Sequence, residues 1–183
     1  MRTALRISWL IAMSFAAALS SAQNSTPLNF NLPDHGKLLL AVPRAWNADV
    51  HPRQGRSAPT LELQQKNAAP FRLLLTPMWT ADSDTPLPND AAVRDKVAAA
   101  AKEAQAQSAE PTLAVNELFG KANRGYYFTA TDRAPKPDEW KYLTQGIVRI
   151  GPIDLAFSVL TNDGQEAVIK DALAMLLTAS HSD

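Results

Sequence analysis

The sequence contains no cysteine, which excludes a disulfide framework, a thiol nucleophile and a lipid-modified N-terminal cysteine. Its seven glycines are scattered singly, so there is no glycine-rich loop to cradle a phosphate. Basic and acidic residues number 18 each and are mixed along the chain. This balance gives no electrostatic footprint for nucleic acid or for an anionic membrane surface.

Long apolar runs are also scarce, and the most extended one lies at the start of the chain. Arg2 and Arg6 precede an apolar run over 7–19, and the small residues Ser20, Ser21 and Ala22 follow it. This three-part pattern is typical of a secretory signal peptide. The run is shorter than the roughly 20 apolar residues that span a bilayer. We therefore predict a signal peptide over residues 1–22, cleaved after Ala22, and a soluble product in the periplasm or outside the cell.

The remaining chain has a length that fits one domain. We expect residues 23–36 to form an N-terminal tail with a short first strand, and residues 37–180 to form a single α+β domain. Segments of alternating apolar and polar residues predict the strands. These segments are 28–32, 37–42, 60–64, 71–79, 112–119, 125–132, 141–150 and 153–162.

Two details refine this prediction. The segment 43–59 has prolines at both ends and no periodicity, so it predicts a loop from which the large ring of Trp46 tucks back onto the core. The segments 60–64 and 71–79 flank a turn and predict a hairpin. Pro77 has no backbone N–H to give to a sheet, so the end of strand 71–79 should lie at an edge or a bulge.

Two helices complete the prediction. The first covers 91–110, with Asn89 or Asp90 as its N-cap, an apolar stripe rich in alanine, and Pro111 as its end. The second covers 165–179, with Val168, Ala172, Met175 and Leu176 on one face. Runs of strands joined by short turns indicate an antiparallel sheet of about six to eight strands. The fold class is α+β, with the sheet flanked by the two helices as an α/β/α sandwich.

The stretches "LAVPRAW" (40–46) and "GYYFTA" (125–130), with a signal peptide before them and an amphipathic helix at the end, resemble the PsbP-like fold group. That group includes the photosystem II extrinsic subunit, the DcrB-like periplasmic proteins and a Ran-binding nuclear import factor. The resemblance implies a small α/β/α sandwich that binds or stabilises partner proteins and is not an enzyme. It transfers no functional residue, because no ligand motif of the group matches positions in this sequence.

The residue types that carry catalysis or bind metals form no motif here. His35 and His51 lie in predicted loops near proline, and His181 lies close to the chain end, where chains fray. No G-x-S-x-G elbow is present, which disfavours a serine hydrolase. Asp34 and His35, with His51, lack the fixed spacing of a metal site. We expect no cofactor or metal.

The acidic residues of the segment 80–90 form no calcium site either. Asp82, Asp84 and Asp90 lack the glycine and the closing glutamate of a calcium loop. They are typical of turn and cap residues.

The stretch "TATDRAPKPDEWKY" (129–142) predicts a long hairpin loop between two strands. Pro135 and Pro137 stiffen its tip, and a stiff loop loses less entropy on binding. The loop offers charged groups of both signs and a tryptophan, a residue favoured at interface hot spots. The candidate binding residues are Asp132, Arg133, Lys136, Glu139 and Trp140. A plain solvated hairpin, with Trp140 packed at the end of the sheet, is the alternative interpretation.

These observations favour a non-enzymatic secreted or periplasmic accessory protein that recognises another protein, a component of the cell envelope. An alternative is a carrier of a small molecule or lipid, with a cavity between the sheet and the alanine-lined helix. A third hypothesis, a hydrolase, would require a pocket that brings His35 or His51 to a carboxylate.

Overall fold

The computed structural model describes residues 24–52, 58–80 and 85–183. The predicted signal peptide, and with it the cleavage point, lies outside the described residues, as do Asp82 and Asp84. The strands are β1 (Ser25–Asn31), β2 (Lys37–Pro43), β3 (Trp46–His51), β4 (Thr60–Gln65), β5 (Arg72–Met78), β6 (Asn116–Phe119), β7 (Arg124–Thr131), β8 (Tyr142–Ile150), β9 (Ile153–Thr161) and β10 (Ser180–Ser182). The helices are α2 (Asp90–Ala104) and α3 (Glu166–Thr178).

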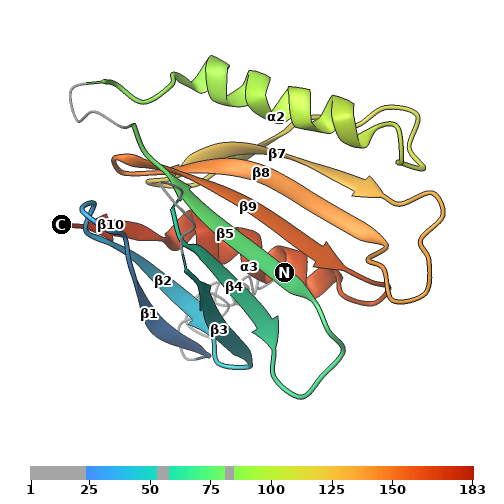
Figure 1. Ribbon diagram of the computed structural model, residues 1–183, viewed down its shortest axis with the longest axis horizontal. Coiled ribbons are helices and arrows are strands. Elements are labelled where there is room, and N and C mark those ends of the chain that lie inside the picture. The colour runs from blue at the N-terminus through green and yellow to red at the C-terminus, as the bar shows by residue number, and fades with distance from the viewer. Residues whose placement is uncertain (1–23, 53–57, 81–84) are drawn as a thin grey trace, which may run out of the picture.

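The larger of two sheets has seven strands in the order β3-β4-β5-β9-β8-β7-β6, and all its pairs are antiparallel. After β5 the chain crosses the sheet through α2 to the far edge, and the hairpins from β6 to β9 bring it back beside β5 (Figure 1). A short turn can join only antiparallel strands. The predicted α+β class with an antiparallel sheet is therefore confirmed.

A smaller antiparallel sheet joins the two ends of the described chain in the order β1-β2-β10. Ser180 of β10 pairs with Leu39 of β2, and the Nε2 atom of His181 lies 2.7 Å from the carbonyl oxygen of His35. The expectation that His181 belongs to a frayed end was therefore wrong. The backbone of β2 provides a ladder that holds the last residues in place.

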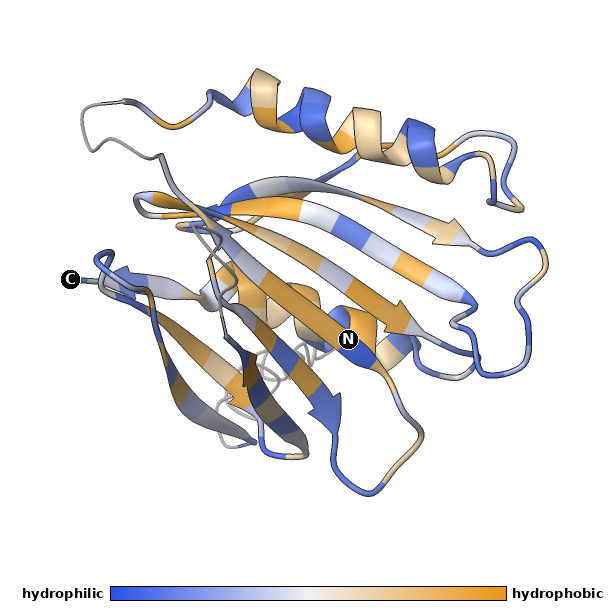
Figure 2. Ribbon diagram, viewed as in Figure 1, coloured by the Kyte–Doolittle hydropathy of each residue, from blue (hydrophilic) through white to orange (hydrophobic). Residues whose placement is uncertain are grey.

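The two helices lie on opposite faces of the large sheet, as the sandwich prediction required. Alternation along each strand sends one set of side chains to each face, which Figure 2 shows as alternating colours along β4 and β8. On the α3 face, fully buried residues of β4, β5 and β9 pack with Ala172, Met175 and Leu176 of α3. On the other face, Val97 and Ala101 of α2 pack on residues of β7.

Helix α2 starts where the sequence predicted and ends earlier. The Asn89 side chain accepts a hydrogen bond from Ala92 N at 2.9 Å, which confirms it as the N-cap. The helix ends at Ala104 instead of 110. The Gln105 side chain then stabilises a turn, because its amide donates to Glu110 O at 2.5 Å and its oxygen accepts from Leu113 N at 2.8 Å.

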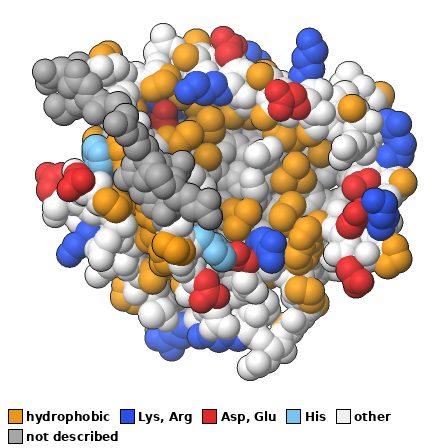
Figure 3. Space-filling view, in the orientation of Figure 1, with side chains coloured by type: hydrophobic (Ala, Val, Ile, Leu, Met, Phe, Trp, Pro, Cys, Tyr) orange, Lys and Arg blue, Asp and Glu red, His pale blue; other side chains and the backbone are white. Residues whose placement is uncertain are grey.

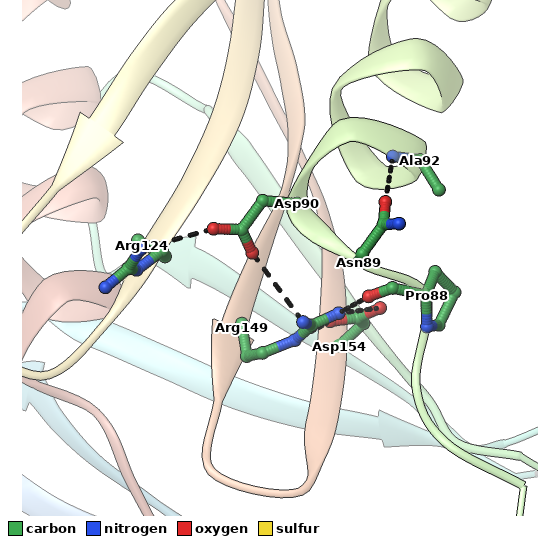
Figure 4. A network of polar contacts seen from close by, with 7 residues as sticks. All are labelled: Pro88, Asn89, Asp90, Ala92, Arg124, Arg149 and Asp154. Carbon is green, nitrogen blue, oxygen red and sulfur yellow. Dashed lines mark hydrogen bonds and ion pairs between the residues drawn. The ribbon is translucent and has the colours of Figure 1, made fainter.

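The N-terminus of α2 is fixed to the sheet by an ion-pair network (Figure 4). Arg149 forms a bidentate pair with buried Asp154, at 2.9 and 3.2 Å, and donates to Pro88 O at 2.5 Å. Asp90 of the first helical turn lies 3.7 Å from Arg149 and 3.2 Å from Arg124. Asp90 therefore has a structural role in this network. The sequence pattern predicts only a turn or cap residue at this position.

Two strand predictions need correction. The predicted loop 43–59 contains β3, which pairs with β4 over six residues although most of its side chains are exposed. The predicted strand 112–119 shortens to β6, because 112–115 form no ladder. Trp46 is buried against Phe71, with ring centroids 4.7 Å apart, as expected.

The hairpin prediction is confirmed, and the prediction for Pro77 holds on one side of β5 only. β4 and β5 pair antiparallel, with Leu63 opposite Leu73 and Leu61 opposite Leu75. Pro77 lies beyond the last residue of β5 that pairs with β4, so on that side it is at a local edge. On the other side it lies within the ladder, opposite Leu155 of β9.

Candidate functional site

The loop 132–141 joins β7 to β8, so the predicted long hairpin is confirmed. Asp132 N donates to Lys141 O at 2.8 Å across the base of the loop. The Asp132 side chain accepts from Ala134 N at 2.9 Å, and the Glu139 side chain accepts from Lys136 N at 2.9 Å. The loop therefore carries internal bonds that order its backbone before any partner binds.

The chain that follows α2 braces the base of this loop. Ala109 N donates to Thr131 O at 2.8 Å, and Arg133 N donates to Gln107 O at 2.9 Å. A guanidinium nitrogen of Arg133 also donates to Ser108 O at 2.8 Å. These bonds attach the loop to the end of the helix, so α2 and the loop form one surface.

Glu110 strengthens the same junction. Its carboxylate accepts hydrogen bonds from Thr131 N at 3.0 Å, from Thr131 Oγ1 at 2.6 Å and from Ser108 Oγ. Burial alone would raise the pKa of Glu110, but these bonds to the charged form outweigh it and lower the pKa from 4.5 to about 2. The side chain is ionised at neutral pH and accepts bonds from both segments.

An open pocket of about 120 Å³ lies between the end of α2 and the base of the loop. Its apolar lining comes from α2, β7, β8 and β9, and Trp140 contributes from the loop. Its volume is below the ~300 Å³ at which small-molecule pockets begin, and it is closer to cavities of about 150 Å³ that hold benzene. It has room for one side chain of a partner. The lining residues are Ala104, Gln107, Ser108, Ala130, Thr131, Asp132, Trp140, Lys141, Tyr142, Leu143 and Leu160.

The structure places the five candidate binding residues in two groups. Asp132 and half-buried Trp140 line the pocket. Arg133 is exposed, and its guanidinium braces the loop. Lys136 and Glu139 lie at the exposed tip, where they form an ion pair at 3.5 Å. The tip charges thus face solvent and partly neutralise each other.

A second ion pair, between Lys141 and Asp163, lies at the rim of the pocket. Lys141 Nζ lies 2.8 Å from Asp163, and the Tyr142 hydroxyl donates to the same carboxylate at 2.7 Å. Hydrogen bonding to Asp163 raises the pKa of Lys141, and hydrogen bonding from Lys141 lowers the pKa of Asp163. Both groups stay charged at neutral pH, so the rim presents fixed charges beside an apolar base.

Sequence reasoning missed the pocket residues that do not belong to the loop. Leu143 and Leu160 face each other in the hairpin of β8 and β9, and Ala104 comes from the end of α2. Each of them has the pattern of an ordinary core or strand residue. The crossing of α2 over the sheet adds Ala104 to the strand pair, and no local pattern could have indicated this contact.

A second polar cluster lies on the face of β3, β4 and β5 opposite α3. Glu62 is 5% exposed, and its carboxylate lies 2.5 Å from His51 Nε2, 2.7 Å from Arg72 Nε and 2.7 Å from Gln64 Nε2. Hydrophobic side chains also come to the surface on this face, below α2 (Figure 3). Sequence reasoning missed this cluster, because β3 had been predicted as a loop.

This cluster brings a histidine to a carboxylate, as the hydrolase hypothesis required, but it lies outside both of the pockets described for this chain. The His51 side chain is 57% exposed, and neither the pocket beside Trp140 nor the one beside Trp46 includes it. His35 instead stacks on Trp79 at 4.3 Å. We therefore interpret Glu62 as the structural acceptor of an ion-pair cluster.

The described residues contain neither a cluster that could hold a metal nor a helix that could cross a membrane. Within residues 24–52, 58–80 and 85–183, no group of three or more His, Asp or Glu side chains could hold a metal ion. No helix in that part of the chain combines the length and the apolar character needed to cross a membrane.

Comparison with known proteins adds little to this geometry. No protein-family model and no curated protein matches the sequence. Among solved structures, a crystal structure of a protein from Bacteroides thetaiotaomicron is similar, with a TM-score of 0.48 and 12% sequence identity. The match covers 80% of this chain and 45% of that protein, so this chain spans less than half of its length. A likeness of this extent carries no argument about function.

Proposed function

We propose that this protein is a non-enzymatic accessory protein of the periplasm or the cell exterior that recognises another protein of the cell envelope. The observation that carries the proposal is the apolar pocket at the base of the braced loop 132–141. The partner inserts one apolar side chain beside Trp140, and its polar groups meet the charges on the rim. A PsbP-like relationship, which we also propose, fits an accessory role of this kind.

Three physical features support protein recognition. The pocket is too small for most metabolites but suits a side chain anchor. Tryptophan is a preferred hot-spot residue when it lies half-buried in such a pocket. The loop is ordered by its bonds to Gln107 and Ser108, so binding costs little conformational entropy.

The carrier hypothesis gains no support from the middle of the α2 face. Ala101 packs directly on Phe128 and Ala130 of β7, so close approach of the helix to the sheet accounts for it. Ala104 does line a hollow, but this is the pocket of about 120 Å³ beside Trp140, which is below the ~300 Å³ at which small-molecule pockets begin.

Capture experiments with the protein as bait test the proposal. The wild-type protein, Trp140→Ala and the double variant Arg133→Ala with Trp140→Ala are each exposed to a cell-envelope extract of the native host. The same partner should bind the wild type and be lost from both variants, because the apolar anchor contact disappears. Lys121→Ala, an exposed change outside the pocket, is the control and should capture normally.

Native mass spectrometry of protein purified from its own host gives an independent readout. A protein without bound small molecules supports recognition of a protein partner. A stoichiometric co-purified lipid or metabolite, or unchanged capture by the double variant, would contradict the proposal.

A further inference from the structure

The two sheets present four edge strands, and three of these are protected against pairing with another chain. In the described part of the chain, β6 has four residues, β10 has three, and β1 carries Pro27, which cannot donate to a ladder. The fourth edge, β3, has six residues with no proline and no lysine. Five of its residues are exposed, and Val50 is 56% exposed. Within residues 24–52, 58–80 and 85–183, no strand pairs with this edge.

The backbone of β3 shows which amides face the open edge. Ala45 O accepts a hydrogen bond from Lys66 N at 2.8 Å, at the start of the β3–β4 ladder. Because bonded and non-bonded pairs alternate in an antiparallel ladder, every second residue after Ala45 bonds to β4. The amides of Trp46, Ala48 and Val50 therefore point away from β4. Among the described residues, no backbone bond from outside this ladder reaches them.

We propose that β3 pairs antiparallel with β3 of a second copy of this chain and so joins the two large sheets into one. The operation is a two-fold axis perpendicular to the sheet, which gives both copies the same interface. With this axis, the α3 faces of both copies lie on the same side of the joined sheet. Each residue of β3 must therefore lie opposite a residue whose side chain points to that same side.

Of the registers that satisfy this condition, two overlap most of β3. One places Asp49 opposite Asp49, where like charges repel. The other places Ala48 opposite Ala48, Val50 opposite Trp46 and Asn47 opposite Asp49, with no like charges opposed. The second register forms about six backbone hydrogen bonds from the outward amides. It is the one that this strand favours.

A pocket beside the edge fits the same register. This pocket, of about 160 Å³, is lined by Leu28 of β1, Val42 of β2, and Trp46 and Ala48 of β3. In the favoured register, Val50 of the second copy lies opposite Trp46, one of the residues that line this pocket, and on the same face of the sheet. The exposed valine of each copy is therefore buried by the other, which adds apolar contact to the backbone pairing.

Cysteine cross-linking tests the register, because the chain contains no cysteine of its own. In Ala48→Cys the two Cα atoms lie about 5.5 Å apart across the pair, within the range that a disulfide allows. In Asp49→Cys the diagonal separation is about 7–8 Å. Under mild oxidation, the Ala48→Cys protein should form a covalent dimer and the Asp49→Cys protein should not. Equal cross-linking of both variants, or of neither, overturns the register.

Sedimentation velocity over a concentration series tests the association itself. The wild type should dimerise at micromolar concentrations, and Val50→Lys should raise the dimer dissociation constant by at least about tenfold, since an edge lysine opposes pairing. The matched control is Phe119→Lys on the β6 edge, whose side chain is 73% exposed, and it should dimerise as the wild type does. Thermal melts followed by circular dichroism confirm that both variants fold.

Other outcomes contradict the proposal. A wild type that stays monomeric throughout, or a dimer that Val50→Lys leaves unchanged, excludes pairing through β3. A monomer that instead takes up an extended peptide along β3 shows that the edge serves a different occupant.

Discussion

Removing the charge of Glu110 should weaken the junction between α2 and the loop 132–141 by a measurable amount. The pKa of Glu110 is lowered from 4.5 to about 2. At 1.36 kcal/mol for each pKa unit, the ionised carboxylate can contribute at most about 3.4 kcal/mol to the free energy of unfolding. The carboxylate is only partly buried, and solvent screening reduces this value. We expect Glu110→Gln to lower the free energy of unfolding by about 1–2 kcal/mol at neutral pH.

The pH dependence gives the sign of the effect. The folded-state pKa lies below the unfolded one, so the contribution is complete above about pH 4.5 and is lost as the pH falls toward about 2. The wild type and Glu110→Gln should therefore differ most at neutral pH and converge at acid pH. Urea unfolding followed by circular dichroism across this range measures the difference.

A matched control is Glu103→Gln, an exposed glutamate on α2, which should change stability little at any pH. Equal stability of Glu110→Gln and the wild type at neutral pH would show that the Glu110 carboxylate does not stabilise the junction. A difference that persists unchanged to the acid end of the range would do the same, because it would show that charge is not the cause.

Three further variants test other parts of the fold. Asn123→Ala should lower the free energy of unfolding in urea by about 2–3 kcal/mol. The reason is that the buried Asn123 amide donates to Leu176 O, Leu177 O and Ala179 O at the end of α3. A loss below about 0.5 kcal/mol would contradict this role. Thr144→Val should leave stability unchanged or raise it by up to about 1 kcal/mol, since the buried Thr144 hydroxyl has no partner among the described residues. A clear loss of stability would show that this hydroxyl does form a hydrogen bond. Asp154→Ala should lower the free energy of unfolding by about 3 kcal/mol or more, because it leaves Arg149 without its bidentate partner. Adding Arg149→Met to this variant should restore part of the lost stability.

The sequence predicted those elements whose side chains alternate strongly or repeat at helical spacing. β9 buries one face completely, and α3 buries Ala172, Met175 and Leu176 at helical spacing, so both elements leave a clear pattern. β3 was not predicted, because only its residue Trp46 is buried and the other side chains show no apolar alternation. Its strand conformation depends on pairing with β4 rather than on side chains packed in the core. The early end of α2 escaped as well, because side-chain bonds of Gln105 replace the helical ladder there.

The same contrast holds for the candidate site. The loop was visible in the sequence, since its prolines and charges interrupt two alternating strands. Its bracing by Arg133 and Glu110 was not visible, because their partners belong to other parts of the chain. The Glu62 cluster likewise depends on the β3–β4–β5 register, which places His51 and Arg72 beside one carboxylate.

We propose that the pocket beside Trp140 receives an apolar side chain of a partner protein. Once a captured partner is identified, its binding to the wild type, to Ala104→Leu and to Ala99→Leu should be measured by calorimetry. Ala104 lines the pocket and Ala99 is exposed on the same helix, so one leucine fills the pocket and the other does not. We expect Ala104→Leu to weaken binding by at least about tenfold and Ala99→Leu to leave it unchanged. Equal affinities for all three proteins would show that the pocket receives no side chain of the partner.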